Sequence, residues 1–291
     1  MMNSKAILII SLFVFIIFSL TTNAQSKKKS DVEREGLRGK VKSVNEKYYE
    51  EKRIFFGLIP IKVQFWDEYK EFNNNGSIIY EEKPSYHGGD YRDREFYKYN
   101  ERGDCVEKID SNYENGNKYS YLSRYEYIYD KKGNIREEKW YSYNKLNYNY
   151  YYKYDDKGNC IEELSKGIKD STFSKDIYKR DTNGQMIVWE RYNKLGDFDS
   201  KLVYKLDESG NRIKVEYYNE DLNKERETIY IYNSEGDVII EIHYDVKSKR
   251  TYSKIYSYQY DDNFNWIKRI EYNEDMNVNY ITKRKIKYYD E

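Results

Sequence analysis

Alanine is nearly missing from this sequence, since only Ala6 and Ala24 occur among its 291 residues. Alanine is the best helix former, so a long chain without it is poorly suited to a helical fold. Cysteine, proline and histidine occur only twice each. Two cysteines cannot build a disulfide framework, and two isolated histidines do not make a zinc site. These scarcities argue against a helical bundle, a disulfide scaffold and a zinc protein.

The charge is balanced, with 51 Lys and Arg against 51 Asp and Glu. This balance argues against a broad basic surface for nucleic acid or anionic lipid. Charged residues make up 35% of the chain and the mean hydropathy is −1.07, values that alone would indicate disorder. However, 37 tyrosines raise the aromatic content to 18%. Because aromatic residues favour strands, the composition predicts a folded β protein.

Residues 1–24 have the pattern of a secretory signal peptide. A positive start at Lys5 precedes the apolar run 6–20, and small residues follow up to Ala24. The run is shorter than the roughly 20 residues that span a bilayer, although a retained signal anchor is the alternative. We expect an exported protein that is periplasmic, cell-surface or secreted, with no stable membrane insertion after cleavage. A basic and polar linker, 25–36, would then lead into a single domain, 37–291.

A motif of the form Tyr-x-Tyr-Asx-x-x-Gly recurs with a period of about 26 residues. Clear copies cover 97–104, 127–134 and 152–159, further copies begin at Tyr178, Tyr204 and Tyr230, and weaker ones surround Gly76 and Phe264. Asx followed three residues later by Gly is typical of a type I turn in a hairpin with a glycine bulge. The predicted turn residues are Asn100, Gly103, Asp130, Gly133, Asp155, Gly158, Asp181, Gly184, Asp207, Gly210, Asn233 and Gly236. Where Phe264 replaces Gly, we expect a distorted turn, or a positive φ at Asn263 or Asn265.

Apolar and polar residues alternate on both sides of each turn, as in half-buried strands. The predicted fold is all-β, an antiparallel meander of about eight tandem hairpin repeats. The sequence leaves open whether the sheet stays open and curved, forms a spiral or becomes barrel-like. The hairpin geometry places Tyr99 opposite Cys105, Tyr154 opposite Cys160 and Tyr260 opposite Trp266. The two cysteines would then lie about 19 Å apart, too far for a disulfide, as separate buried thiols.

The repeats, best seen in Tyr127–Asn134 and Tyr152–Asn159, resemble the YD repeats of the RHS family over roughly residues 70–270. In that family the repeats form β-rich surface or secreted structures, and members are described as carbohydrate-binding or involved in contact between cells. Long arrays enclose a toxic C-terminal domain. About eight repeats are too few to enclose a cargo, and the chain ends at Glu291 where a ninth turn would begin. The resemblance therefore implies a short stand-alone exported repeat protein without a toxin domain.

No catalytic, cofactor or metal site is predicted, and we expect a protein that is not an enzyme. His87 is expected in a solvated loop and His243 at the surface near a strand end, while the run Lys283-Arg284-Lys285 is expected on a solvated strand face. The predicted function is non-catalytic binding or structural support at the cell envelope or outside it. The partner would be a polysaccharide or a surface protein, not a nucleic acid.

Exposed aromatics are the candidate ligand-binding residues, namely Trp66, Trp140, Trp189, Tyr121 and Tyr150. One alternative is a scaffold that associates with itself or with other proteins through open strand edges. Another is a carbohydrate-active enzyme, which would need a deep cleft with two carboxylates of separated pKa.

Overall fold

The computed structural model describes residues 29–54, 59–85, 92–114, 117–168 and 173–290. Within these residues the chain forms one short helix and 18 strands. In chain order they are α1 (Asp31–Arg34), β1 (Val41–Ile54), β2 (Ile59–Phe72), β3 (Ile78–Pro84), β4 (Arg92–Tyr99), β5 (Cys105–Glu114), β6 (Asn117–Tyr129), β7 (Ile135–Ser142), β8 (Lys145–Tyr154), β9 (Cys160–Gly167), β10 (Phe173–Arg180), β11 (Met186–Tyr192), β12 (Phe198–Leu206), β13 (Arg212–Tyr218), β14 (Lys224–Tyr232), β15 (Val238–Asp245), β16 (Arg250–Tyr260), β17 (Trp266–Tyr272) and β18 (Val278–Tyr288).

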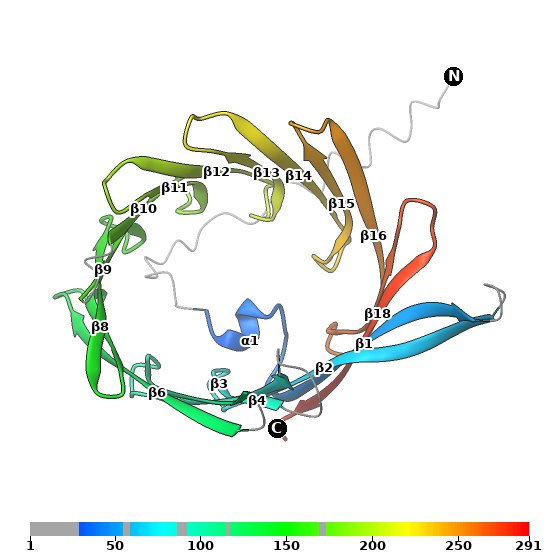
Figure 1. Cartoon of the computed structure of the whole chain (residues 1–291), viewed down its shortest axis with the longest axis horizontal. Helices are drawn as coiled ribbons and strands as arrows, with labels where there is room; N and C mark the ends of the chain where they lie inside the picture. Colours follow the sequence, from blue (N-terminus) through cyan, green and yellow to red (C-terminus); the bar gives the residue numbers. More distant parts are fainter. Residues whose placement is uncertain (1–28, 55–58, 86–91, 115–116, 169–172, 291) are drawn as a thin grey trace, which may run out of the picture.

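Each strand pairs antiparallel with the next, and β18 pairs antiparallel with β1, so the sheet closes into a ring (Figure 1). Val44 lies opposite Ile286 and Tyr48 opposite Thr282 across this closing pair. The predicted all-β antiparallel meander is confirmed in its barrel-like form, and the open and spiral alternatives are wrong. Closure is favoured because it pairs the two edges that an open meander would expose. The count of about eight repeats stays a prediction.

The predicted Asx turns form where the sequence places them, from Asn73 to Asp261, and each joins an even-numbered strand to the next. Turns with the same hydrogen bonds at Asn193, Asn219 and Asn273 join odd-numbered strands to the next, at the opposite rim. In the turn at Asp130, its backbone N–H donates to Asn134 O at 2.8 Å and Gly133 N–H donates to Asp130 O at 3.1 Å. The Asp130 side chain accepts from the N–H groups of Lys132 and Asn134 at 2.8 and 2.9 Å. Gly133 has φ +88°, a left-handed conformation that favours glycine. Because these turns alternate with the other hairpin loops, they share one rim of the ring, the Asx rim.

Phe264 corrects one expectation about these turns. It adopts the left-handed conformation itself, with φ +59°, and neither Asn263 nor Asn265 takes the positive φ. The turn keeps the hydrogen bonds of the others, since Phe264 N–H donates to Asp261 O at 3.0 Å. The turn geometry therefore overrides the residue's preference, at a cost of about 1–2 kcal/mol.

The predicted register is confirmed. Tyr99 lies opposite Cys105, Tyr154 opposite Cys160, and Tyr260 opposite Trp266, each directly beside a register shift. Both cysteines are free, as expected, although they are half-buried rather than fully buried.

Tyrosine hydroxyls replace missing backbone bonds at the Asx rim. The β7–β8 ladder stops at the pair of Glu137 and Tyr151, short of the rim. Beyond it, Tyr154 donates its hydroxyl to Ile135 O at 2.8 Å, the carbonyl that the ladder leaves unpaired. The same side-chain-to-carbonyl bond recurs around the ring at 2.5–3.1 Å, in the pairs Tyr99–Ile78, Tyr127–Cys105, Arg180–Cys160, Tyr232–Arg212, Tyr258–Val238 and Tyr289–Phe72.

A second set of tyrosines reaches back to the preceding Asx turn. Tyr260 Oη donates to Asp237 at 2.8 Å and accepts from Asn233 Nδ2 at 2.7 Å. Tyr129 bridges the turn at Asn100 and Asp104 in the same way. These bonds explain why tyrosine precedes Asx in the repeat.

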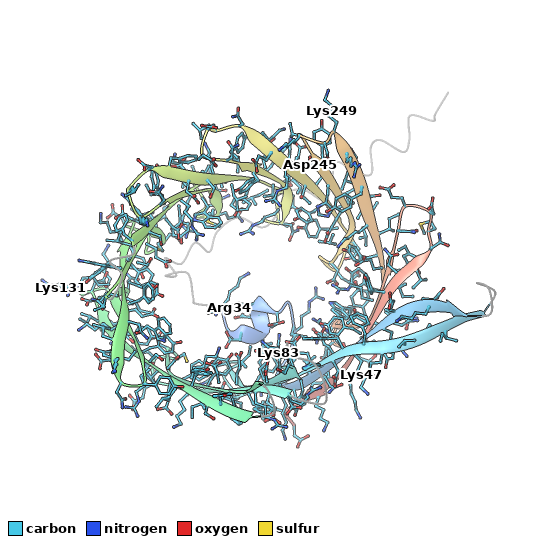
Figure 2. The ribbon with its side chains drawn as sticks, viewed as in Figure 1. Arg34, Lys47, Lys83, Lys131, Asp245 and Lys249 are labelled. Atoms are coloured by element: carbon cyan, nitrogen blue, oxygen red, sulfur yellow. The ribbon has the colours of Figure 1, made fainter. Side chains whose placement is uncertain are left out.

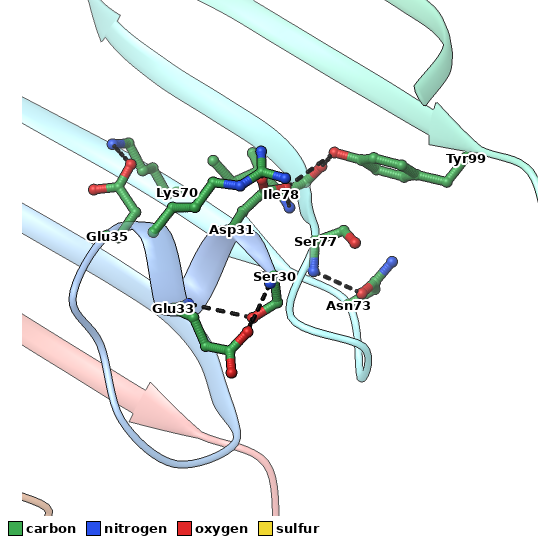
Figure 3. A network of polar contacts seen from close by, with 10 residues as sticks. Ser30, Asp31, Glu33, Glu35, Lys70, Asn73, Ser77, Ile78 and Tyr99 are labelled. Carbon is green, nitrogen blue, oxygen red and sulfur yellow. Dashed lines mark hydrogen bonds and ion pairs between the residues drawn. The ribbon is translucent and has the colours of Figure 1, made fainter. Parts of the chain in front are cut away.

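Helix α1 lies inside the ring (Figure 1), within residues 25–36, the predicted linker. Its Ser30 and Glu33 form a capping box, and Val32 packs with Phe72 in a small buried cluster. Val32 N–H donates to Gly76 O at 2.9 Å. Figure 3 shows α1 and its flanking residues held by contacts to β2, β3 and β4, including Lys70 Nζ to Glu35 at 2.8 Å.

The position of α1 identifies the two faces of the sheet. Arg34 of α1 lies within the ring, whereas Lys47 of β1 projects away from it (Figure 2). Side chains directly opposite each other on paired strands share a face, and alternate residues face opposite ways. The inner face carries most of the aromatic rings. The outer face carries cross-strand ion pairs at 2.5–3.0 Å, among them Lys98–Glu107, Lys153–Glu162, Lys179–Glu190 and Lys214–Glu227. No helix in the described part of the chain is long and apolar enough to cross a membrane.

Replacing Tyr260 with Phe should lower the free energy of unfolding by about 1–2 kcal/mol, because Asp237 and Asn233 lose their shared partner. Denaturant unfolding at neutral pH measures this change. Tyr244→Phe is the matched control, since Tyr244 is exposed and its hydroxyl has no hydrogen-bond partner among the described residues. Equal effects of the two substitutions would show that the hydroxyl bonds at the Asx rim do not stabilise the ring.

Phe264→Gly should raise the free energy of unfolding by roughly 1 kcal/mol, because it removes a left-handed non-glycine residue. Little packing is lost, since Phe264 is 60% exposed.

The reciprocal change, Gly103→Ala, should lower the free energy of unfolding by about 1 kcal/mol, because Gly103 has φ +79° and open space around its Cα. Thermal unfolding of both variants checks the pair, and a loss of stability in Phe264→Gly would contradict the prediction.

Candidate functional site

A cavity of about 1190 Å³ lies inside the ring between α1 and the inner faces of β4, β5 and β6. Asp31 and Arg34 line it from the helix side. The opposite side is formed by the tyrosines Tyr97, Tyr125 and Tyr127, with Lys108 among them. Barrels of about 16–18 strands are too wide for side chains to fill, which accounts for a cavity at this position.

The tyrosine side of this cavity continues along the sheet. Tyr125 lies directly opposite Trp140 on β7, which lies directly opposite Tyr148 on β8. The rings of Trp140 and Tyr148 stack at 5.6 Å with an interplanar angle of 20°, and Tyr148 stacks on Tyr150 at 6.1 Å and 27°. We call this surface the aromatic wall, formed by Tyr97, Tyr125, Tyr127, Trp140, Tyr148 and Tyr150.

The Trp140 indole N–H is buried and has no hydrogen-bond partner among the described residues. A buried indole N–H usually finds a partner. Because this nitrogen is buried, the unsatisfied donor lies beneath the surface of the aromatic wall.

Most polar groups on the wall are already engaged. Glu95 accepts a hydrogen bond from Tyr97 and pairs with Lys108 at 2.9 Å, and Lys108 also pairs with Asp110 at 2.8 Å. Burial opposes ionisation of Glu95, but these two partners hold its pKa below the usual range. Burial and the Glu95 carboxylate raise the pKa of Tyr97, so its hydroxyl stays protonated as a donor. The wall therefore presents ring faces rather than free charges to the cavity.

One carboxyl group beside the wall behaves differently. Glu163 on β9 lies opposite Tyr152, and its pKa is raised, chiefly by burial and further by the nearby Asp176. The Tyr178 hydroxyl, at 3.2 Å from Glu163 Oε2, partly offsets this effect.

The structure brings together only some of the predicted ligand-binding residues. Trp140 and Tyr150 both belong to the aromatic wall. Tyr121 shares their face but lies towards the rim opposite the Asx rim, where it contacts Tyr143 and is 40% exposed. Trp189 on β11 is engaged elsewhere, because its Nε1 donates to Asp176 at 2.9 Å and Arg191 stacks on its ring.

Trp66 lies opposite Tyr48 across the β1–β2 pair, away from the wall. Sequence reasoning missed Tyr97, Tyr125, Tyr127 and Tyr148 as site residues. Their alternation shows that they share a face, but it does not show which face turns towards a cavity.

The placement of His243 corrects another expectation. It is not a surface residue, because its ring is half-buried on the inner face, stacks on Tyr252 at 4.6 Å, and contacts Thr228 Oγ1 at 3.1 Å. His87 lies outside the described residues.

Burial raises the pKa of Cys105 and raises that of Cys160 to about 11, so both thiols are poor nucleophiles at neutral pH. No group of His, Cys, Asp or Glu among the residues that the structure describes could hold a metal ion.

No protein-family model and no curated protein matches the chain. Among solved structures, a porin-like protein from Bacteroides uniformis is similar at 10% identity and a TM-score of 0.44, covering 85% of this chain and 98% of that one. The TcdB2-TccC3 structure is similar at 12% identity and a TM-score of 0.37, covering 80% of this chain and 13% of that one. A DUF1329 family protein from Desulfovibrio piger is similar at 10% identity and a TM-score of 0.24, covering 88% and 89%. At these TM-scores the similarities support no functional conclusion.

The protein should lose stability as the pH rises from about 10 to 12. Burial raises the pKa of Tyr154 and of Tyr258 to about 12, so in this window the folded chain holds protons that the unfolded chain releases. Below pH 10 these groups are protonated in both states and add no pH dependence. Denaturation midpoints across the window measure the loss, and tyrosinate absorbance follows the ionisation.

The double variant Tyr154→Phe and Tyr258→Phe is the control for this effect. It should be less stable at neutral pH and should show a shallower decline above pH 10. A midpoint that stays constant up to pH 12 in the unmodified protein would contradict the assignment.

Proposed function

We propose that this protein is a non-catalytic, exported carbohydrate-binding protein of the cell envelope or extracellular space. It holds a glycan inside the ring against the aromatic wall. The observation that carries the proposal is the cavity of about 1190 Å³, whose tyrosine side continues into the Trp140–Tyr148–Tyr150 stack.

The chemistry of the wall suits a sugar. Aromatic rings in a concave site provide apolar faces on which the C–H faces of a pyranose can stack, while a few polar groups set orientation. Trp140 belongs to the ring stack with Tyr148 that would provide such a face. Arg34 and Asp31, on the α1 side of the cavity, add polar groups across from the rings.

The charged groups of the wall already have partners within the protein, which favours binding over catalysis. Glu95 is committed to Tyr97 and Lys108, and Glu138 accepts a hydrogen bond from Tyr152 at 3.1 Å. A carbohydrate-active enzyme is the second candidate, because the raised pKa of Glu163 is a property of a general acid. An assay for glycan hydrolysis with Glu163→Gln as its control distinguishes the two functions.

Export and family membership form part of the same proposal. The pattern of residues 1–24 supports a signal peptide, and the Tyr-x-Tyr-Asp-x-x-Gly-Asn motif supports a short member of the RHS family of YD repeats. A scaffold that associates through strand edges has less support than in an open meander, because β1 and β18 pair with each other. An edge remains on β2, since β3 pairs with it only over Tyr69–Phe72 among the described residues.

The test is binding of the purified protein to a panel of bacterial and host polysaccharides and their oligosaccharides. We expect saturable binding that quenches or shifts tryptophan fluorescence. Trp140→Ala should weaken binding by at least about tenfold, the effect of losing a central aromatic contact.

Trp189→Ala is the matched control, since Trp189 also faces inwards but lies four strands from Trp140. It should leave affinity nearly unchanged. Absence of binding across the panel would remove the carbohydrate proposal, and equal losses in both variants would place the ligand away from the aromatic wall.

A further inference from the structure

Lysines gather on the outer face of three neighbouring strands, β17, β18 and β1. Lys268 lies directly opposite Lys283, and Lys283 lies directly opposite Lys47. Lys285 and Lys287 continue along β18 on the same face, opposite Asn45 and Ser43. We call these five residues the lysine patch, namely Lys47, Lys268, Lys283, Lys285 and Lys287.

Successive side chains of β18 point to opposite faces of the sheet, so the run Lys283-Arg284-Lys285 has residues on both the inner and the outer face. Arg284 points inwards, where its guanidinium lies 3.4 Å from the centre of the Trp266 ring and pairs with Glu46 at 2.6 Å. Lys283 and Lys285 therefore point outwards, and both are exposed. Lys47 projects away from the ring in Figure 2, which places the patch on the outer wall.

The patch differs from other stretches of the outer wall, where lysines on neighbouring strands share a carboxylate. Lys153 and Lys175 both pair with Glu162, and Lys179 and Lys201 both approach Glu190. No lysine of the patch forms an ion pair with any described residue. The acid opposite Lys47 on β2, Asp67, is paired with Arg92 at 2.7 Å.

Like charges directly opposite each other across paired strands destabilise a sheet. Lys268, Lys283 and Lys47 form such a row across three strands, and no described carboxylate forms an ion pair with any of them. An anionic partner would remove this repulsion.

An apolar strip lies next to the lysine patch on the same outer face. Ile270 and Tyr272 of β17 face outwards beside Lys268, and Tyr272 lies opposite Ile255 on β16. The strip continues in register through Ile240 and Ile231, and Ile231 is 43% exposed. The residues of the strip next to the patch are partly exposed. Lysines beside partly exposed apolar side chains suit an anionic bilayer, with the charges at the headgroups and the apolar groups at the interface.

We propose that the lysine patch docks the outer wall of this ring onto the surface of a bilayer that contains anionic phospholipid. The five ammonium groups contact lipid phosphates, and the neighbouring isoleucines and Tyr272 lie at the headgroup boundary. A polysaccharide or nucleic acid would use the charges but would leave the isoleucines in water. The interaction is peripheral, and it is independent of glycan binding in the cavity.

The test is sedimentation of the purified protein with vesicles of phosphatidylcholine alone and of phosphatidylcholine mixed with phosphatidylglycerol. We expect binding that requires phosphatidylglycerol and weakens as salt is added. The variant Lys268→Gln, Lys283→Gln, Lys285→Gln and Lys287→Gln should bind the mixed vesicles roughly a hundredfold more weakly, since each lysine near an anionic surface contributes severalfold.

The matched control replaces Lys153, Lys175, Lys179 and Lys201 with Gln, which removes the same charge from the ion-paired wall. It should retain vesicle affinity. Thermal unfolding provides a second readout, because neutralising the patch removes repulsion and should raise the melting temperature, whereas the control should lower it. All variants are prepared as the chain from Gln25 that signal cleavage would leave, without the apolar run 6–20, so the comparison reports the patch.

Equal vesicle binding by the two variants would overturn the proposal. Binding to DNA or dextran sulfate as tight as to the mixed vesicles would also overturn it, because the partner would then be a soluble polyanion.

Discussion

The hydrogen bond from a tyrosine hydroxyl to a main-chain carbonyl at the Asx rim is the interaction on which this ring depends. Backbone ladders between neighbouring hairpins end before the rim, leaving carbonyls such as Ile135 O without a strand partner. An unpaired carbonyl in a half-buried position is costly, and a phenol reaches it without the backbone having to approach. Tyrosine is suited to this position because its ring also packs on the inner face. The way the hairpins are joined thus accounts for tyrosine at the positions next to the Asx turns.

These bonds let the rim spread while staying connected, so the chain can form a wide ring. The two faces of the ring then have different roles. Stacked rings and hydroxyls line the interior, where α1 and the cavity lie, whereas paired lysines and glutamates cover most of the exterior. The aromatic wall and the lysine patch are each a departure from the pattern around them. Among the described residues, the Trp140 indole N–H of the first has no acceptor, and the lysines of the second form no ion pair.

Local features of the fold could be predicted from the sequence, because local residues determine them. An Asx with Gly three residues later specifies the turn, and the turn specifies that Tyr154 faces Cys160. Closure could not be predicted, since it depends on the match between β1 and β18 and on the curvature accumulated over all the strands. For the same reason the sequence could not tell which face of the alternation lies inside, so Trp140 and Trp189 were equivalent candidates. The balanced net charge gives no sign of the lysine patch. Lys47 and Lys283 are far apart in the chain and become neighbours only when the ring closes.

Closure also has a consequence for how the molecule folds. Every strand pairing joins consecutive hairpin strands except the last, in which residues such as Glu46 and Arg284 meet across 238 positions. Local pairings form early because they require little loop-closure entropy, and a single long-range step must follow them. Until that step, β1 and β18 would each present an unpaired edge, and the edge of one molecule could satisfy the complementary edge of another. The concentration at which the chain folds therefore decides between rings of one molecule and exchanged assemblies of several.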